Sequence, residues 1–509
     1  MSANLHDVLF PASLPGTATA LTLAGTGGVW SRARLADTAG RIAAVLRAAG
    51  VVPGDRVAAQ VEKSGEAVAL YLACLKAGAV YLPLNTAYTP HEMAAFLGDA
   101  EPTVFVGQPQ AMAALAPHLP EGCTRFTLDA AGGGSLSDAA DAHFPLVESM
   151  PRGRDDLAAI LYTSGTTGRA KGAMITHGNL IHAAEALNAL WGITGDDVLL
   201  HALPVFHAHG LFIAINCALR AGAPIWFLPK FAVDPVIDLL PRSTLFMGVP
   251  TLYTRLLGDP RLTRDLCGRM RLFTSGSAPL SGTTFDAFRD RTGHAILERY
   301  GTTETAIISS NPLIGDRIQG TVGYAMPDVE VRIFGEAGEE MPRGDVGEVV
   351  LRGPNVFAGY WRMPEESTAA FTPDGFFRTG DLARMGEDGR ITIVGRAKDL
   401  IISGGYNVYP REVEAALARL DGVEDCAVIG VPHPDFGEGV IAIVERKPGL
   451  PAPEPAALLS GLSGALARYK LPKHLIVQDA LPRNAMGKVQ KTELRRIHAG
   501  IFQDGSDAA

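Results

Sequence analysis

Residues 161–172 read LYTSGTTGRAKG, and this stretch decides how the rest of the chain is interpreted. It contains five hydroxyl side chains, three glycines, an arginine and a lysine. The apolar run 157–161 before it predicts a short buried strand, and 179–187 after it has apolar residues at helical spacing. Glycines let backbone N–H groups approach anionic oxygens, and hydroxyls and lysine add donors. The order of strand, glycine-rich loop and helix therefore predicts a phosphate-binding loop.

The Walker A loop, G-x-x-x-x-G-K-[ST], is one alternative for this stretch. Counted from Gly165, Lys171 lies at the lysine position. However, Ala170 replaces the second glycine, and Gly172 replaces the serine or threonine that binds magnesium. Because two required positions differ, the sequence predicts a nucleotide loop of another design.

Length and composition indicate a globular protein of several domains. The 509 residues are too many for one hydrophobic core. Hydrophobic residues make up 47% and charged residues 19%, which is ordinary for a folded protein. The net charge of −9 disfavours general attraction to nucleic acid or anionic membranes. If the substrates are anionic, the lysine or arginine side chains that bind them must be gathered at the site itself.

Cysteine usage and hydropathy favour a cytoplasmic protein without a membrane span. The five cysteines are scattered and form no C-x-x-C pair, so we expect neither a disulfide framework nor a cysteine zinc site. The N-terminus has no basic segment followed by a long apolar core, so we expect no signal peptide. The most apolar window, 67–84, is interrupted by Lys76, Gly78 and Pro83. It predicts a buried helix over Gly65–Ala77 and then a strand.

Periodicity along the chain predicts an α/β fold followed by an α+β unit. Strand and helix signals alternate to about residue 240, beginning with helix, turn and strand over 30–61. From Val322, short alternating segments with Gly and Pro turns predict a β-rich subdomain. Beyond a boundary at 395–398, helices over 410–420 and about 458–466 and strands over 426–430 and 440–444 predict a compact C-terminal domain.

Three other segments carry candidate chemistry. Glu304, in the YGTTET stretch 300–305, follows a predicted strand at 295–297 and suits Mg²⁺ beside a phosphate loop. Residues 275–280, SGSAPL, lack the G-x-S-x-G spacing of a serine-hydrolase nucleophile. His207 and His209 could share one face of a strand as a metal pair. With no third ligand nearby, satisfied or substrate-facing histidines are favoured over zinc.

These segments together resemble one enzyme family. In sequence order and spacing, the chain is similar to the acyl-adenylate-forming enzymes, which include acyl-CoA synthetases, luciferases and peptide-synthetase adenylation domains. The resemblance covers essentially the whole chain and rests on 163–172, 300–305, 380–381, 395–396 and 482–488. More closely, the chain resembles malonyl-CoA synthetases. That likeness rests on 81–88 (YLPLNTAY), 247–255 (MGVPTLYTR) and 353–362 (GPNVFAGYWR). It departs from them at Thr302 and at 306–308 (AII).

The resemblance implies a domain plan. It predicts a large N-terminal AMP-binding domain, 1–395, of layered αβα sheets with a β-rich subdomain over about 322–395. A hinge at 396–398 would join it to a small mobile α+β domain, 399–509. Rotation of the small domain about Lys398 would separate two half-reactions.

The resemblance also implies site residues. Lys488 would be the adenylation catalyst, and Thr163 and Glu304 would hold Mg²⁺. Asp381 would bind the ribose hydroxyls, and Arg396 would contact ribose and phosphate. Further contacts to ATP or CoA would come from Ser164, Gly165, Thr166, Thr167, Gly168, Lys171, Ser277, Ala278, Pro279, Glu298, Tyr300, Gly301, Thr302, Thr303, Lys398, Ser403, Gly404 and Gly405. The last three would border a tunnel for the pantetheine arm of CoA.

For the substrate, the resemblance implies that His209 and Ser277 shape the acid pocket and that Arg255 pairs with the second carboxylate of malonate. Periodicity alone places Arg255 off the apolar stripe of its helix and predicts a solvated side chain. The expected activity is ATP- and Mg²⁺-dependent ligation of malonate to coenzyme A, with methylmalonate tolerated. Another short- or medium-chain acid, or the loading of a carrier instead of CoA, remains open. A lysine acetyltransferase acting on Lys488 is also expected.

Overall fold

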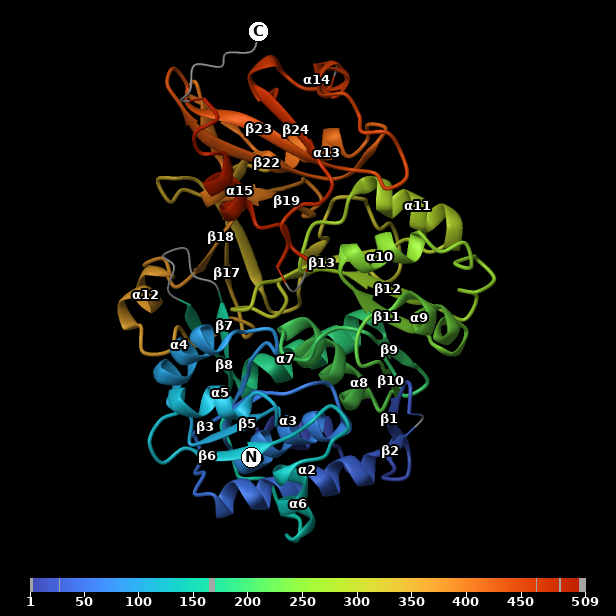
Figure 1. Ribbon diagram of the computed structural model, residues 1–509, viewed down its shortest axis with the longest axis vertical. Helices are drawn as coiled ribbons and strands as arrows, with labels where there is room; N and C mark the ends of the chain where they lie inside the picture. Colours follow the sequence, from blue (N-terminus) through green and yellow to red (C-terminus); the bar gives the residue numbers. More distant parts are fainter. Residues whose placement is uncertain (1–2, 27, 164–169, 464, 485–486, 503–509) are drawn as a thin grey trace.

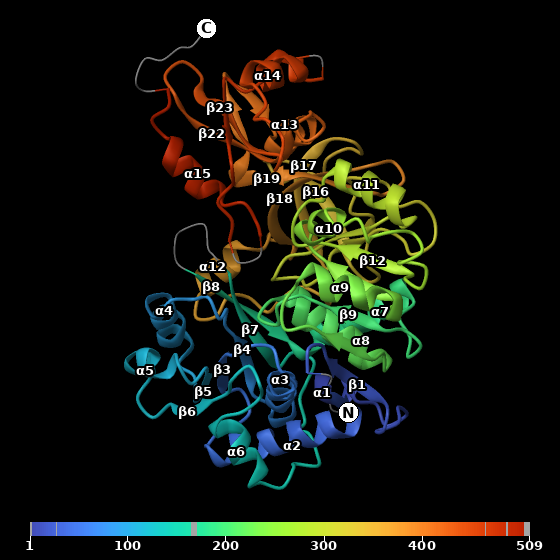
Figure 2. The same cartoon turned by 45° about the vertical axis from the view of Figure 1, so that its right-hand side comes forward.

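The computed structural model describes residues 3–26, 28–163, 170–463, 465–484 and 487–502. Two large sheets form the lower and middle parts of the molecule, and two smaller sheets lie above them (Figure 1). Figure 2, turned by 45°, shows the C-terminal segment with β22, β23, α13 and α15 standing over the β7–β8 region and α10. The predicted combination of α/β layers with a smaller α+β unit is confirmed.

The six-stranded sheet carries the quoted loop at one edge. Its order is β6-β5-β3-β4-β7-β8, and all neighbours are parallel except β7 and β8. Parallel strands buried on both faces explain the apolar runs in this region. The strands are β3 (Arg56–Gln60), β4 (Val80–Pro83), β5 (Val104–Gly107), β6 (Thr124–Thr127), β7 (Leu157–Thr163) and β8 (Lys171–Thr176).

The nine-stranded sheet carries the other site segments at its strand ends. Its order is β15-β14-β13-β12-β11-β9-β10-β1-β2, with a parallel centre and antiparallel edges. The strands are β1 (Thr19–Leu23), β2 (Val29–Ser31), β9 (Leu199–His201), β10 (Ile225–Phe227), β11 (Leu245–Gly248), β12 (Leu272–Ser275), β13 (Leu297–Tyr300), β14 (Ser309–Ser310) and β15 (Tyr324–Ala325).

Helix α3 (Gly65–Ala77) is a central element of the core, as its continuous hydrophobicity predicts. Every residue of it except Glu66 is buried. Ser64 caps its start, and Gly78 ends it with a φ of 74°, which glycine adopts without strain. The other helices of this part are α1 (Leu5–Leu9), α2 (Arg32–Ala48), α4 (Pro90–Ala100), α5 (Met112–Leu115), α6 (Ser135–Asp141), α7 (His177–Trp191), α8 (Asn216–Ala221), α9 (Val233–Leu239), α10 (Pro250–Leu257) and α11 (Gly282–Thr292).

The upper part contains the two smaller sheets. The antiparallel four-stranded sheet accounts for the predicted β-rich texture, and its strands are β16 (Glu330–Phe334), β17 (Val346–Arg352), β18 (Phe377–Met385) and β19 (Ile391–Arg396). The C-terminal sheet contains β20 (Ile401–Ser403), β21 (Tyr406–Val408), β22 (Val423–His433), β23 (Gly437–Arg446) and β24 (His474–Gln478). The remaining helices are α12 (Pro364–Ala369), α13 (Pro410–Leu417), α14 (Pro455–Ser463) and α15 (Lys491–His498).

Some predicted boundaries are wrong. Helix α13 ends at Leu417, because a tight turn reaches Leu420 and Gly422 reverses the chain with a φ of 83°. Helix α14 begins earlier than predicted, at Pro455, a residue well suited to a first helical turn. The strand predicted at 295–297 is shifted to Leu297–Tyr300.

The predicted order of strand, loop and helix is also wrong. Strand β8 pairs antiparallel with β7, with Thr163 opposite Lys171, so the loop connects two strands. Helix α7 begins only at His177, capped by Thr176. The cause is the apolar segment 173–175, which extends the sheet before the helix can start. The N-terminus of α7 therefore does not follow the loop directly.

No helix among the described residues combines the length and apolar character that a membrane crossing requires. The apolar window 67–84 is instead α3 and β4. All five cysteines are buried free thiols.

Candidate active site

A chain of side-chain contacts connects the two ends of the quoted loop to Glu304. The Thr163 hydroxyl donates to the Lys171 carbonyl at 3.4 Å. The Lys171 ammonium lies over the Tyr360 ring, 4.9 Å from its centroid. The Tyr360 hydroxyl in turn donates to Glu304 Oε1 at 3.1 Å. This chain of contacts gathers residues that lie far apart in the sequence. Residues 164–168, also predicted to bind nucleotide, are outside the described part.

The donor set here fits magnesium better than zinc. A hydroxyl at Thr163 and a carboxylate at Glu304 are oxygen ligands, and Mg²⁺ takes one or two of these together with phosphates and waters. The described residues hold no group of three or more His, Cys, Asp and Glu side chains that could bind a metal alone. A metal here would need oxygens from a bound phosphate.

Asp381 is the centre of a second cluster. It lies on β18 opposite Arg396 of β19, is 3% exposed, and pairs with Arg396 Nε at 2.6 Å. Its other carboxylate oxygen accepts from the Tyr300 hydroxyl. Burial raises the pKa of Asp381, and Arg396 opposes that effect. A buried carboxylate and a guanidinium beside an aromatic residue can hold a diol and an adjacent anion.

Lys488 reaches this cluster from the C-terminal segment. Its backbone N–H donates to the Asn484 side chain at 3.0 Å, and its carbonyl accepts from the Asn484 N–H at 2.9 Å. A side chain at the preceding Gly487 would come within 3.1 Å of the Thr251 hydroxyl, so this turn packs on the start of α10. Desolvation and Arg396 lower the pKa of the Lys488 ammonium, whereas Asp381 raises it. A cation is therefore held next to the predicted ribose and phosphate contacts.

Glu298 links the site to the C-terminal segment by charge. It is 4% exposed and accepts from the Gly320 N–H at 3.0 Å. Burial raises the pKa of Glu298 to about 7, and Arg411 of α13 opposes the shift. Arg411 also donates to the Ile393 carbonyl of β19 at 2.5 Å. The C-terminal segment thus places a second cation near the site besides Lys488.

The structure brings His209 and Ser277 together. The His209 Nδ1 lies 3.3 Å from the Ser277 hydroxyl. Ser277 follows β12 and has a φ of 70°, a strained value for serine that is common at functional turns. The predicted strand for His207 and His209 is wrong, because His209 begins a π-helix, η2 (His209–Ile215). Helices of this type occur often at functional sites.

Arg299 is a site residue that the sequence reasoning missed. It lies on β13 between Glu298 and Tyr300, and is 5% exposed. Its Nε and Nη2 atoms have no hydrogen-bond partner among the described residues. A Cβ at Gly276 would meet the guanidinium at 2.5 Å, so a side chain there would displace it. Burial lowers the pKa of Arg299 to about 10. A buried guanidinium with open donors beside Ser277 and His209 is suited to bind an anion.

Arg255 has a different environment. It lies exposed in the last turn of α10 and forms no ion pair within the described part of the chain. It is one helical turn beyond Thr251, which packs against the Lys488 loop. Its predicted contact with substrate stays a prediction.

The remaining predicted residues divide into two groups. Near the site, a Cβ at Gly301 would strike the Ala306 carbonyl at 2.3 Å, and the Thr302 N–H donates to the Thr305 hydroxyl at 3.1 Å. Ala278 and Pro279 continue the turn after Ser277. Farther along the chain, Lys398 is exposed in a 3₁₀ turn, η4 (Ala397–Asp399). Residues 403–405 lie in the β20–β21 hairpin, where the Gly404 N–H donates to the Phe436 carbonyl at 2.9 Å, and their predicted place beside a CoA tunnel stays a prediction.

Comparison with protein families decides the class. Residues 12–361 match the family model of the AMP-binding enzyme, and residues 412–488 match the AMP-binding enzyme C-terminal domain. The chain belongs to the AMP-binding enzyme family. The resemblance inferred from the sequence is thereby confirmed.

Members of the AMP-binding enzyme family similar to this chain include proteins of known structure. ATP-bound MatB from Rhodopseudomonas palustris is 52% identical, with a TM-score of 0.96 over 99% of this chain and 100% of that chain. Feruloyl-CoA synthase from Amycolatopsis sp is 38% identical over 94% of this chain and 96% of its own. Malonate–CoA ligase from Arabidopsis thaliana is 35% identical over 88% of this chain and 78% of its own.

Proposed function

We propose that this protein is an ATP-dependent acid–CoA ligase that converts malonate, ATP and CoA to malonyl-CoA, AMP and pyrophosphate. The observation that carries the acid assignment is Arg299. Its buried guanidinium has open donors next to Ser277 and His209. The similarity to MatB and to malonate–CoA ligases supports the same choice.

Malonate has one carboxylate to activate and one to recognise. A buried guanidinium can hold the second carboxylate with two hydrogen bonds. An acid that lacks this group leaves Arg299 desolvated and unpaired, which is unfavourable. Acetate and propionate should therefore be poorer substrates, whereas methylmalonate keeps both carboxylates.

The first half-reaction uses the cluster around Asp381. An oxygen of the substrate carboxylate attacks the α-phosphorus of ATP, and the bond to the departing pyrophosphate breaks, which gives acyl-AMP. Lys488 would stabilise charge on the carboxylate and α-phosphate in the transition state. Asp381 would hold the ribose hydroxyls, and Arg396 the adjacent phosphate. Mg²⁺ held by Thr163 and Glu304 would balance phosphate charge.

In the second half-reaction the CoA thiol attacks the acyl carbonyl, and AMP leaves. We propose that the C-terminal domain rotates at Lys398 between the two steps, so that Lys488 leaves and the 403–405 hairpin approaches the site. A cytoplasmic location and control of Lys488 by acetylation, which would remove its charge, belong to the same proposal.

The test is AMP release from a panel of carboxylic acids, with and without CoA. The proposal predicts CoA-dependent turnover that is highest with malonate. Higher turnover with butyrate or an aromatic acid than with malonate would show that the enzyme is an acid–CoA ligase for a different substrate. Pyrophosphate release with no thioester product would indicate the loading of a carrier.

Variants of two arginines locate the carboxylate contact. Arg299→Met should lower kcat/KM for malonate by a factor equivalent to about 2–5 kcal/mol, the range for breaking a buried charge pair. The preference for malonate over propionate should become smaller. Arg255→Ala should have a similar effect if that residue also meets the substrate. Unchanged acid selectivity in Arg255→Ala would show that Arg255 does not contact the substrate. Unchanged selectivity in both Arg299→Met and Arg255→Ala would contradict the assignment of a dicarboxylate substrate.

A further inference from the structure

The connection between β3 and α3 contains a buried lysine that the chemistry described so far does not use. Lys63 is 9% exposed, and no carboxylate among the described residues contributes to its pKa shift. Burial lowers its pKa well below the ordinary value. It also directly precedes Ser64, the cap of α3, where the helix dipole disfavours a positive charge.

The hydrogen-bond acceptors for the Lys63 ammonium all come from one segment of chain, at the end of β9 and just after it. Its Nζ donates to His201 Nδ1 at 2.9 Å, to the Leu203 carbonyl at 3.0 Å and to the His201 carbonyl at 3.3 Å. It also lies 4.3 Å from the centroid of the Phe227 ring, on the neighbouring strand β10. Lys63 therefore fixes the place where the chain leaves β9.

His201 transmits this restraint to η2. Its Nε2 is 2.9 Å from the Gly210 carbonyl, which can only accept, so Nε2 carries the proton and Nδ1 accepts from Lys63. A Cβ at Gly210 would meet the Pro204 carbonyl at 2.0 Å, so the segment 201–210 folds back tightly on itself. Both ends of this segment are thus tied to the His201 ring.

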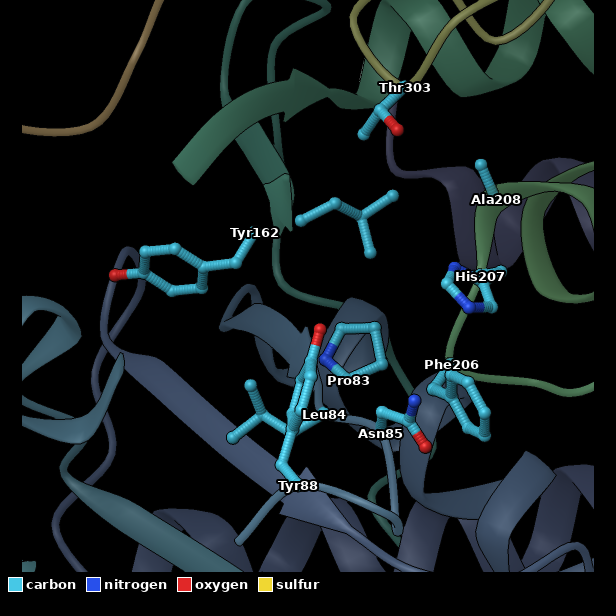
Figure 3. Close-up of a pocket in the computed structure, with 10 residues that line it drawn as sticks. Pro83, Leu84, Asn85, Tyr88, Tyr162, Phe206, His207, Ala208 and Thr303 are labelled. Atoms are coloured by element: carbon cyan, nitrogen blue, oxygen red, sulfur yellow. The ribbon is translucent and has the colours of Figure 1, made fainter. Parts of the chain in front are cut away.

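The segment 201–210 carries the two histidines of the site. His209 contacts Ser277, and its Nε2 is buried without a partner among the described residues. His207 lines a small pocket with Asn85, Tyr88 and Thr303 (Figure 3). Asn85 and Tyr88 are held from the end of β3, just before the β3–α3 connection, because the Gln60 amide donates to their carbonyls at 3.0 and 3.2 Å.

We propose that Lys63 and His201 are a positioning pair: they hold the 201–210 segment so that His207 and His209 face the acid and the site segment containing Thr303. The proposal rests on the proposed function and adds residues that do not touch substrate. Stability alone does not call for a lysine here, since an apolar side chain fills a buried site without desolvating a charge. What lysine supplies is a donor directed at one nitrogen of His201 and at two carbonyls.

Lys63→Met tests the pair, because methionine keeps an unbranched side chain and removes the donor. Lys76→Met is the matched control, since Lys76 is 5% exposed and donates to the Val147 carbonyl at 2.8 Å, away from the site. The assay uses the acid on which the wild-type enzyme is most active, so it stays informative if that acid is not malonate. We expect the KM for the acid to rise about tenfold or more in Lys63→Met only, because small displacements of site groups are costly. The KM for ATP should stay within about twofold of the wild-type value in both variants.

Loss of thermal stability in both lysine variants, with the KM for the acid unchanged in both, would overturn the proposal and leave Lys63 a structural residue. If Lys63→Met does not fold, two substitutions of His201 test the positioning role instead. Glutamine keeps one donor and one acceptor, whereas phenylalanine keeps only the ring shape. The proposal predicts that His201→Gln retains the KM for the acid better than His201→Phe. Equal KM values in these two variants would also contradict it.

Discussion

At the scale of single residues, Lys488 has the most direct predicted role in the first half-reaction. Its ammonium lies in the field of Arg396 and Asp381, where the α-phosphate of a transferring adenylyl group would develop charge. Lys488→Ala should therefore lower the rate of acyl-AMP formation by at least about 10²-fold, as does removal of one preorganised donor. Thioester formation from supplied acyl-AMP should largely survive. Single-turnover assays of the two steps measure this, with the exposed Lys447→Ala as control. Equal losses in both steps would refute the role.

Glu298 should make the stability of the protein depend on pH. Its pKa is raised from 4.5 to about 7 in the folded chain, so the folded state binds more protons than the unfolded state between these values. The free energy of unfolding should therefore fall as pH rises from about 4.5 to about 7, by roughly 2–3 kcal/mol for this group. Glu298→Gln imitates the protonated form and should remove this part of the pH dependence. Thermal unfolding at pH 5 and pH 8 measures it, and an unchanged difference between wild type and variant would contradict the assignment.

Single residues also show how far the sequence reached. The family resemblance singled out Asp381, Arg396 and Lys488, and the structure brings them together, whereas their roles stay predictions. Arg299 was missed because the strand predicted from the sequence ended at residue 297. Even over the observed strand, alternation indicates only that Arg299 faces away from Glu298 and Tyr300. The other groups at that face, Gly276 and His209, come from other parts of the chain. An arginine in a buried strand was the available signal.

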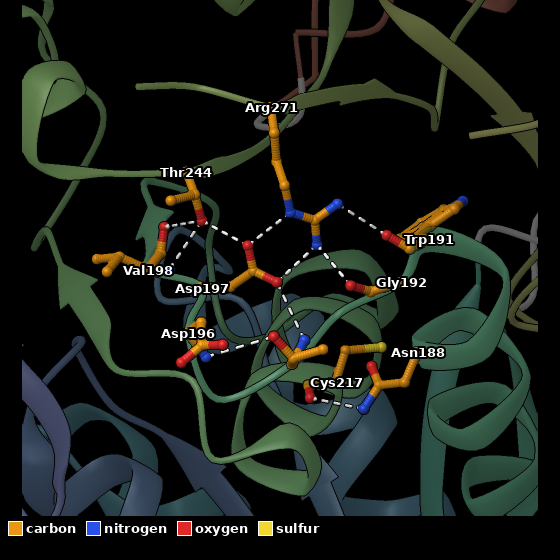
Figure 4. A network of polar contacts seen from close by, with 10 residues as sticks. Asn188, Trp191, Gly192, Asp196, Asp197, Val198, Cys217, Thr244 and Arg271 are labelled. Atoms are coloured by element: carbon orange, nitrogen blue, oxygen red, sulfur yellow. Dashed lines mark hydrogen bonds and ion pairs between the residues drawn. The ribbon is translucent and has the colours of Figure 1, made fainter. Parts of the chain in front are cut away.

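At the scale of elements, one ion pair joins α7 to the nine-stranded sheet (Figure 4). Arg271, at the start of β12, contacts both carboxylate oxygens of Asp197 at 2.6 Å and donates to the Trp191 and Gly192 carbonyls at the end of α7. Thr244 donates to the same carboxylate at 2.7 Å. The network satisfies helix carbonyls that would otherwise lack partners.

Arg271→Ala should destabilise the protein, because it leaves the nearly buried Asp197 carboxylate without its cation. The side chain of Asp197 is 5% exposed and that of Arg271 is 32% exposed. We therefore expect a loss of roughly 2–4 kcal/mol, somewhat below the range for a fully buried pair. Urea denaturation measures it. The exposed pair of Arg289 and Asp290 offers the control, since Arg289→Ala should cost less than about 1 kcal/mol. Equal losses would contradict the role of the network.

Elements were predicted well where the local pattern decides them. The helix over Gly65–Ala77 matches the structure because its cap, apolar run and terminal glycine agree. Strand β8 was missed because six residues between a loop and a helix carry little periodicity, and only pairing with β7 makes them a strand. The π-helix at His209 was missed because its geometry depends on His201, Lys63 and the packing of Gly210.

At the scale of the whole molecule, the C-terminal segment stands over the β7–β8 region and α10 (Figure 2). From this segment, Lys488 reaches the charges of Arg396 and Asp381. This arrangement suits the proposed adenylation step, and thioester formation would use the proposed second arrangement, in which the 403–405 hairpin approaches the site. Lys398→Pro should oppose rotation between the two arrangements, since proline fixes φ and restricts the preceding residue. We expect acyl-AMP formation to be retained and thioester formation to be strongly reduced. An unimpaired second step in single-turnover assays would show that Lys398 is not the hinge.

The most direct measurement of the central claim is a competition for limiting CoA. The wild-type enzyme is given ATP, Mg²⁺ and equal concentrations of malonate, methylmalonate, propionate and butyrate, and the thioesters are identified by mass spectrometry. The buried guanidinium of Arg299 predicts malonyl-CoA as the main product, with methylmalonyl-CoA next. A mixture dominated by propionyl-CoA or butyryl-CoA, or one without any thioester, would contradict the proposed function.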